Sequence, residues 1–271
     1  MRPILRPAGA ALLAALALLA GCGTTTPGGV PIDTTYSSRG QDSRVMFLVI
    51  HYTVANFPLS LKILTEGDVS AHYLLSDESP PRIYRLVDES RRAWHSGPSA
   101  WRGHRMLNAS SIGIEIVHPG IVNTPEGRVF APFRQDQIDT LIPLVKDIVA
   151  RHGIRPERIV GHSDVLPLHK QDPGPTFPWK RLADEGLIPW PDATRVAAQR
   201  AVYEAQPPDV AWFQRALATH GFDIPQTGTL DAATRTMLAA FQMKYRPARY
   251  DGEPDAETAA LLQVLNTPRP R

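Results

Sequence analysis

Short hydrophobic runs and stretches of helical spacing alternate along the middle of the chain. The hydrophobic runs are of strand length, and the apolar run 45–50 ends directly at His51. Residues 135–152 repeat apolar positions with helical spacing and stop before a Gly, although Pro143 predicts a kink. Strands that alternate with helices predict an α/β domain over about residues 41–190. The predicted strands are 45–50, 71–76, 82–87, 111–117 and 158–160, and the predicted helices are 58–64 and 135–152.

The pattern changes near residue 207, which predicts a second and smaller domain. Two consecutive Pro residues follow a polar, Ala-rich connector at 191–207. Beyond them, three short segments have helical spacing, and about sixty residues give such helices only a limited core. Nothing in these segments is typical of catalysis. We therefore interpret residues 208–271 as a small three-helix binding domain.

The first residues have the pattern of an export signal. Arg2 and Arg6 precede an apolar run, Ala8–Ala20, which is too short to cross a bilayer as a free helix. The run ends in Leu-Ala-Gly before Cys22, the only Cys of the chain. This ending resembles the bacterial lipobox, in which the Cys becomes the lipidated first residue of the mature protein. A plain signal peptide followed by an incidental Cys is the alternative.

The lipobox resemblance implies a location. Gly23, rather than Asp, follows the Cys, which by resemblance to sorting rules favours the outer membrane. Several acyl chains on one Cys make a lasting anchor, whereas one chain holds a protein only marginally. We expect a signal peptide at 1–21, a polar tether at 22–40, and attachment to outer-membrane lipid through Cys22 on the periplasmic side.

Composition narrows the possible partners. With 43% hydrophobic and 21% charged residues, the chain has the make-up of a globular protein. Its 29 Lys and Arg residues include Arg2 and Arg6 of the export signal, so the remaining 27 balance the 27 Asp and Glu residues. A nucleic-acid partner would demand a clustered basic surface, and the sequence gives no sign of one.

Candidate metal ligands lie at a strand end and in a loop rich in Pro. Residues 161–175 read GHSDVLPLHKQDPGP, and their three Pro residues rule out a helix or a core strand. His162 and Asp172 belong to this rigid loop, and His51 closes the first predicted strand. Two His and a carboxylate can hold zinc and leave a fourth position open, as catalytic zinc sites do. A core histidine is the alternative for His51.

Glu115 is a further candidate, because it stands among apolar neighbours in a predicted strand. The segment 111–117 reads SIGIEIV. A carboxylate in a central strand is costly unless it is paired or has a chemical role. The alternative is an edge strand whose Glu points to solvent.

Five motifs in sequence order, FLVIHYT, VSAHYLL, AWHSG, SSIGIEIV and GHSDVLPLHKQDPGP, resemble the zinc-dependent N-acetylmuramoyl-L-alanine amidases of the Amidase_2 class, the AmpD and AmiD type. These hydrolases cleave the amide bond between the lactyl group of muramic acid and the first L-Ala of the peptidoglycan stem peptide. The resemblance covers about 41–190 and implies a central mixed β-sheet flanked by helices, with a zinc site in a surface cleft. The C-terminal stretches TGTLDAATRTMLAAFQMKY and YDGEPDAETAALLQVLN resemble, more weakly, a peptidoglycan-binding domain.

The resemblance also implies roles for individual residues. It places one zinc ion on His51, His162 and Asp172, the catalytic carboxylate at Glu115, and an oxyanion-stabilising lysine at Lys170. For Lys170, an exposed loop lysine without a role in catalysis is the alternative.

The rim of the expected site is less well determined. The family usually has Gly and Arg before the lysine, whereas this chain has Leu168 and His169, and the role of His169 stays open. Side chains near the motifs can line a groove for sugar and peptide, because aromatic faces pack on both and Asn bonds amides. Packing or loop structure is the alternative for each of them. They are Tyr52, Trp94, His95 and Asn108.

We therefore predict an N-acetylmuramoyl-L-alanine amidase of the bacterial cell envelope that acts on peptidoglycan or muropeptides in cell-wall turnover or recycling. Two alternatives remain. One is a non-catalytic peptidoglycan-recognition protein on the same fold, and the other is a zinc peptidase that cuts within the stem peptide. The sequence decides neither the preference for anhydro-muramic acid nor the oligomeric state.

Overall fold

The computed structural model describes residues 23–125 and 127–267, so Cys22 and the export signal lie outside the described part. The chain divides into two compact units, residues 1–42 and 43–271. In the first unit, strands β1 (Gly23–Thr25) and β2 (Pro31–Asp33) form an antiparallel pair. Within the described residues, no helix combines the length and apolar character needed to cross a membrane.

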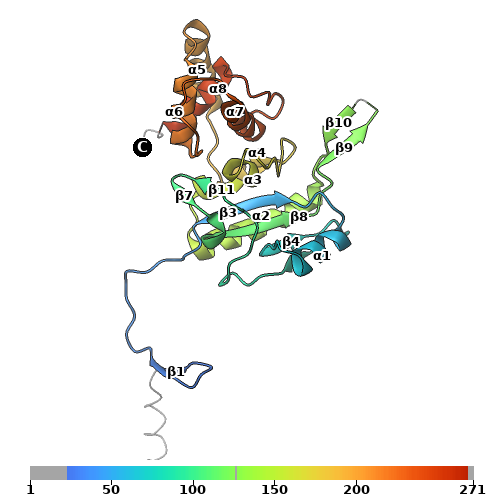
Figure 1. Ribbon diagram of the computed structural model, residues 1–271, viewed down its shortest axis with the longest axis vertical. Helices are drawn as coiled ribbons and strands as arrows, with labels where there is room; N and C mark the ends of the chain where they lie inside the picture. Colours follow the sequence, from blue (N-terminus) through green and yellow to red (C-terminus); the bar gives the residue numbers. More distant parts are fainter. Residues whose placement is uncertain (1–22, 126, 268–271) are drawn as a thin grey trace, which may run out of the picture. The chain divides into compact units, whose positions relative to one another are not determined.

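A five-stranded mixed sheet organises the second unit (Figure 1). Four strands run parallel and one edge strand runs antiparallel, which confirms the predicted α/β fold with a mixed sheet. Every strand predicted from the hydrophobic runs belongs to this sheet. In spatial order the strands are β11 (Ile159–Gly161), β3 (Phe47–Tyr52), β8 (Ser111–Ile116), β4 (Tyr73–Leu75) and β5 (Ile83–Arg85).

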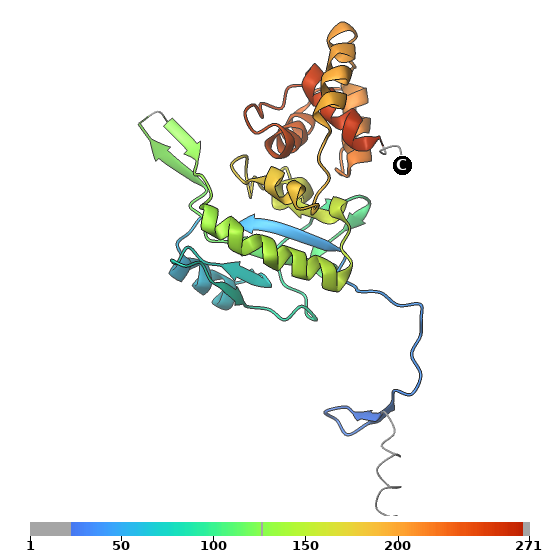
Figure 2. The same ribbon diagram turned by 180° about the vertical axis from the view of Figure 1, so that it is seen from behind.

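Helix α2 (Gln135–His152) covers one face of this sheet (Figure 2). Its apolar residues pack against alternate residues of the two central strands, Leu48 and Ile50 on β3 and the isoleucines of β8. Pro143 lies inside the helix without ending it. Helix α1 (Phe57–Glu66) packs with Leu74 of β4 in a smaller cluster.

The predicted C-terminal helices are α6 (Val210–His220), α7 (Ala232–Tyr245) and α8 (Ala256–Asn266). Each begins after an Asp whose side chain accepts a hydrogen bond from the backbone of the first turn, as N-cap residues do. The segment predicted as a linker also forms a helix, α5 (Ala193–Ala205), which packs along α8 (Figure 1).

The C-terminal helices share a hydrophobic core with the α/β domain. Phe47 and Val49, on the face of β3 turned away from α2, belong to the same buried cluster as Phe213 of α6 and Phe241 of α7. Trp101 contributes an edge-to-face contact with Phe222 across this boundary. The two predicted domains therefore meet through packed side chains and not only through a connecting segment.

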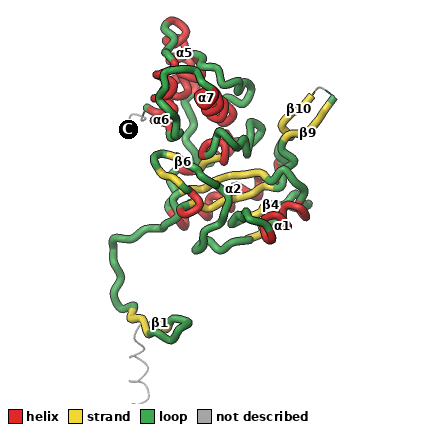
Figure 3. The backbone as a smooth tube through the Cα atoms, viewed as in Figure 1, coloured by secondary structure: helices red, strands yellow, loops and turns green. Residues whose placement is uncertain are grey.

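Several short elements were not predicted from the hydrophobic pattern. The antiparallel pair β9 (Ile121–Thr124) and β10 (Gly127–Phe130) projects beside the sheet (Figure 3). The remaining elements are β6 (Ala100–Trp101), β7 (His104–Arg105), α3 (His162–Val165), α4 (Trp179–Asp184) and 3-10 turns at Leu107–Ala109 and Pro156–Arg158. The prediction that 161–175 contains no helix is therefore wrong at its start, because the short helix α3 ends before the first Pro of the segment, Pro167.

Candidate active site

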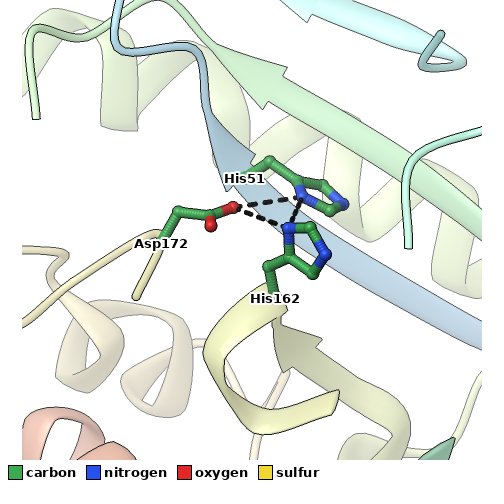
Figure 4. Close-up of side chains that lie close together, drawn as sticks. All are labelled: His51, His162 and Asp172. Atoms are coloured by element: carbon green, nitrogen blue, oxygen red, sulfur yellow. Dashed lines mark hydrogen bonds and ion pairs between the residues drawn. The ribbon is translucent and has the colours of Figure 1, made fainter. Parts of the chain in front are cut away.

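Three polar side chains meet at one end of strand β3 (Figure 4). His51 Nδ1 lies 3.0 Å from His162 Nδ1 and 3.1 Å from Asp172 Oδ2. His162 Nδ1 lies 3.2 Å from the same carboxylate oxygen. All three residues are buried. Their donor atoms thus converge on one point, an arrangement that can hold a metal ion.

The local fold explains why the three residues meet. His51 is in β3, and His162 begins α3 directly after β11, the neighbouring parallel strand. The backbone N–H of Ser163 donates to the carbonyl oxygen of Asp172 at 2.8 Å, which ties the two ends of the Pro-rich loop together. Gly161 allows this close approach, because a Cβ there would lie 2.7 Å from Pro173.

The spacing of the donor atoms fits zinc. Zn–N and Zn–O bonds of about 2.0–2.2 Å at tetrahedral angles place neighbouring donors roughly 3.3 Å apart. The separations in this trio are 3.0, 3.1 and 3.2 Å. The residues therefore match the donor set and nearly the dimensions that a zinc ion requires.

The protonation states fit a metal as well. Burial and the neighbouring His162 lower the pKa of His51 to about 4, so its imidazole is neutral at pH 7. Burial by itself would raise the pKa of Asp172, but hydrogen bonds with His162 and His51 hold this pKa below its usual range. A neutral imidazole and an ionised carboxylate are the forms that bind metals.

Glu115 lies beside this trio. It pairs in register with His51 on the adjacent parallel strand, and β8 is a central strand, so the edge-strand alternative is wrong. Its Oε2 atom is buried without a hydrogen-bond partner among the described residues. Burial, with the nearby negative charge of Asp172, raises the pKa of Glu115 to about 8. A buried acceptor with no partner is uncommon and marks a site of chemistry.

A cleft of about 420 Å³ opens onto these residues. Glu115, His162 and Asp172 line it, together with the exposed side chains of Lys170 and His169. The Pro-rich loop therefore presents its lysine at the mouth of the cleft, and His169 lies on the same rim.

Not all of the four candidate wall residues line the cleft. Tyr52 and the exposed Trp94 line the cleft. Burial, with the charge of Asp172, raises the pKa of Tyr52 to about 12, so its hydroxyl stays protonated. Asn108 lies outside the lining of this cleft, where its Oδ1 accepts hydrogen bonds from the backbone N–H groups of His95 and Ser96 at 3.0 and 2.7 Å.

His95 has a contact that the sequence did not predict. It borders the cleft but is only 7% exposed, and its Nδ1 lies 3.0 Å from His51 Nε2. Its Nε2 lies 3.1 Å from Ser111 Oγ, which in turn donates to the carbonyl oxygen of Leu107 at 2.6 Å. A chain of hydrogen bonds thus leads away from the candidate metal ligand into the core.

If His51 binds a metal, this series of hydrogen bonds determines which ring nitrogen of His51 and of His95 carries the proton. Metal binding through His51 Nδ1 requires a proton on Nε2, which then donates to His95 Nδ1. His95 consequently carries its own proton on Nε2 and donates to Ser111. Gly113 makes room for the ring, because a Cβ at this position would lie 2.5 Å from His95 Cγ. The His in AWHSG and the Gly in SSIGIEIV were the only sequence signals of this contact.

The other candidate histidine ligand, His162, has no such partner at its Nε2 atom among the described residues. His162 Nε2 is buried without a hydrogen-bond partner among the described residues, and Asp164 bonds elsewhere. The side-chain contacts of the His162 ring are therefore those of Nδ1 with His51 and Asp172.

Known proteins match this sequence along most of the chain. Residues 41–175 match the N-acetylmuramoyl-L-alanine amidase family, and residues 206–262 match a peptidoglycan binding domain. The chain is 45% identical to the N-acetylmuramoyl-L-alanine amidase AmiD of Escherichia coli K12 over 94% of this chain and 95% of that protein. It is 34% identical to the 1,6-anhydro-N-acetylmuramyl-L-alanine amidase AmpD of Enterobacter cloacae over 41% of this chain and 57% of that protein.

Solved structures agree. The complex of E. coli AmiD with anhydro-N-acetylmuramic acid-L-Ala-D-gamma-Glu-L-Lys superposes with a TM-score of 0.80 at 43% identity, covering 89% of this chain and 96% of that one. AMPDH3 from Pseudomonas aeruginosa gives a TM-score of 0.80 at 38% identity, covering 86% and 95%. Given this identity and coverage, together with the matching fold and buried His-His-Asp group, the chain belongs to the N-acetylmuramoyl-L-alanine amidase family of hydrolases.

Proposed function

We propose that this protein hydrolyses the amide bond between the muramic acid lactyl group and L-alanine of peptidoglycan fragments, with one zinc ion held by His51, His162 and Asp172. The convergence of their three donor atoms within 3.0 to 3.2 Å beside the unpaired carboxylate oxygen of Glu115 carries the proposal. Zinc at this position supplies a Lewis acid and lowers the pKa of water from about 16 to about 7.

The protein's own groups perform the proton transfers. The pKa of Glu115 is raised in the metal-free site, and the charge of a zinc ion beside it would favour the ionised carboxylate. In that form Oε2 would accept the proton of the attacking water and return it to the leaving nitrogen of alanine, a role worth about 10²–10⁴-fold in rate. The exposed Lys170 at the cleft mouth places a positive charge where the carbonyl oxygen becomes negative. The cleft walls at Tyr52 and Trp94 orient the sugar and peptide.

The substrate class follows from the relatives. The E. coli AmiD complex contains an anhydro-muramic acid carrying L-Ala-D-gamma-Glu-L-Lys, and the match at residues 206–262 is to a peptidoglycan binding domain. We propose muropeptides of this kind as substrates, in cell-wall recycling, with domains at 41–190 and 208–271 joined through 191–207.

Digestion of muropeptides tests the reaction. Protein lacking residues 1–22 is incubated with muropeptides and the products are identified by mass spectrometry. The expected product is a stem peptide that begins with L-Ala, and it vanishes when zinc is chelated. Cuts only inside the peptide would support the zinc-peptidase alternative. Retention on insoluble wall without any cleavage would support the recognition-protein alternative.

We propose further that the protein is a lipoprotein of the outer membrane that faces the periplasm. The Leu-Ala-Gly-Cys sequence at Cys22 supports this, as does Gly23. Cells grown with labelled palmitate should label the protein and not its Cys22→Ser variant. Equal absence of label in both would contradict the anchor.

A further inference from the structure

A lysine of the C-terminal helices is buried against the loop that carries His162. Lys244, near the end of α7, places its Nζ 2.8 Å from Asp164 Oδ2, and the two side chains are only 6% and 3% exposed. The same Nζ lies 4.2 Å from the centre of the Trp179 ring and 3.4 Å from the carbonyl oxygen of Ile159. A buried lysine with this surrounding is uncommon, because ammonium groups rarely leave water unless they are paired.

Its partner, Asp164, lies in the turn that begins with His162. Asp164 Oδ2 also accepts a hydrogen bond from the backbone N–H of Gly161 at 2.8 Å, which closes the first turn of α3. His162 is the first residue of this turn, and Ser163 within the turn donates to the carbonyl oxygen of Asp172. The carboxylate of Asp164 therefore holds the turn whose backbone carries His162 and bonds to Asp172.

Lys244 compensates the negative charge of Asp164, because both side chains are buried. Without this ammonium group, Asp164 Oδ2 would keep the hydrogen bond from Gly161 but lose the charge that compensates it, and an uncompensated buried charge is strongly unfavourable. The carboxylate would turn toward water, which weakens its hydrogen bond to Gly161. The turn that holds His162 would then lose its fixed geometry.

We propose that Lys244 is a positioning residue for the metal site, so that the C-terminal helices complete the active site in addition to any role in binding peptidoglycan. This inference rests on the proposed metal site at His51, His162 and Asp172. Lys244 acts through Asp164 and the α3 turn and touches no ligand directly.

Zinc affinity of the whole mature chain, measured by competition with a chromogenic chelator, tests this role without relying on turnover. Lys244→Met should weaken zinc binding by about 10–100-fold, the range seen when a group that orients a metal ligand is removed. Adding Asp164→Asn to Lys244→Met should restore wild-type affinity, because the amide oxygen still accepts from Gly161 and no charge is left unpaired.

Arg246 offers a matched control in the same region. It is also buried, and its ion pairs are with Asp255 and Glu257 inside the C-terminal helices. Arg246→Met should lower the midpoint of thermal unfolding while zinc affinity stays at the wild-type value. A general loss of stability would instead weaken zinc binding in both single variants.

The outcomes separate this inference from the proposed function. If the wild type binds no zinc, the metal site itself is wrong and both fail. If the wild type binds zinc, then equal affinity in Lys244→Met, or equal weakening in Arg246→Met, overturns the role of Lys244 alone. Should Lys244→Met not fold, Lys244→Gln replaces the ammonium with an uncharged amide and should also weaken zinc binding. A folded Lys244→Gln variant with wild-type zinc affinity would also overturn it.

Discussion

The two faces of the central strand pair β3 and β8 carry opposite chemistry. Toward α2, alternate residues are wholly apolar and buried, among them Ile50 and Ile114. On the cleft face, β3 carries Phe47 and Val49 in the core shared with the C-terminal helices and then His51, which pairs in register with Glu115. The other positions of β8 on this face, Ser111 and Gly113, are polar or small. Successive side chains of a strand point to opposite faces, so one hexapeptide can stabilise the domain and supply its chemistry.

The two faces contribute differently to stability and to activity. The α2 face gains free energy from burial, whereas the cleft face keeps groups that burial opposes, such as the unpaired carboxylate oxygen of Glu115. Substitutions on one face should change unfolding, and substitutions on the other should change zinc binding or turnover.

The largest effect is expected on the cleft face. Glu115→Gln removes the proton acceptor and should lower kcat by about 10²–10⁴-fold. Zinc content, measured by atomic emission, should stay at one ion per chain, because the trio of ligands is intact. A variant that loses its zinc would show that Glu115 is a ligand or a support for one.

On the opposite face, Ile114→Ala truncates a fully buried side chain next to Glu115 in the sequence. It should lower the free energy of unfolding by about 2–5 kcal/mol, as measured by urea denaturation. At a temperature where the variant is folded, kcat and zinc affinity should match the wild type. A drop in kcat as large as that of Glu115→Gln would contradict the separation of the two faces.

A smaller effect is expected from the hydrogen-bond chain behind His51. His95→Ala removes the acceptor for His51 Nε2 and should weaken zinc binding by about 10–100-fold in a chelator competition. Ser111→Ala breaks the same chain one step further away and should weaken binding less. If Ser111→Ala had the larger effect, the chain would not act through His95.

The pH dependence of unfolding should be the smallest of these changes over any single pH unit, although it accumulates between pH 4.5 and 8. The folded pKa of Glu115 is raised to about 8 from an ordinary value of 4.5, so between these values the folded state keeps a proton that the unfolded chain has released. In metal-free protein this group therefore lowers stability as pH rises from 4.5 to 8, by at most about 1.4 kcal/mol per pH unit. Urea titrations should show Glu115→Gln gaining on the wild type across this window and no further gain above it. A constant difference would mean that Glu115 has an ordinary pKa.

The hydrophobic pattern predicted the α/β fold and the three C-terminal helices. The resemblance of five motifs to the amidase family implied the mixed sheet and residues that line the cleft, such as Glu115 and Asp172, but it also suggested Asn108, which lies outside the lining. Alternation of apolar and polar residues is a local property, so the strands and helices can be read from short windows. The Pro-rich loop and the strand end at His51 could be recognised for the same reason, because each motif is contiguous.

Only the tertiary structure decided which distant groups touch. The contact of His95 with His51 joins residues 44 positions apart, and the ion pair of Lys244 with Asp164 joins residues 80 positions apart. The helical linker α5 and the core shared by the C-terminal helices and the sheet are also long-range results. Such contacts depend on how elements pack and not on local spacing, so the pattern along the chain predicts the elements and their motifs, whereas folding selects the partners of each buried polar group.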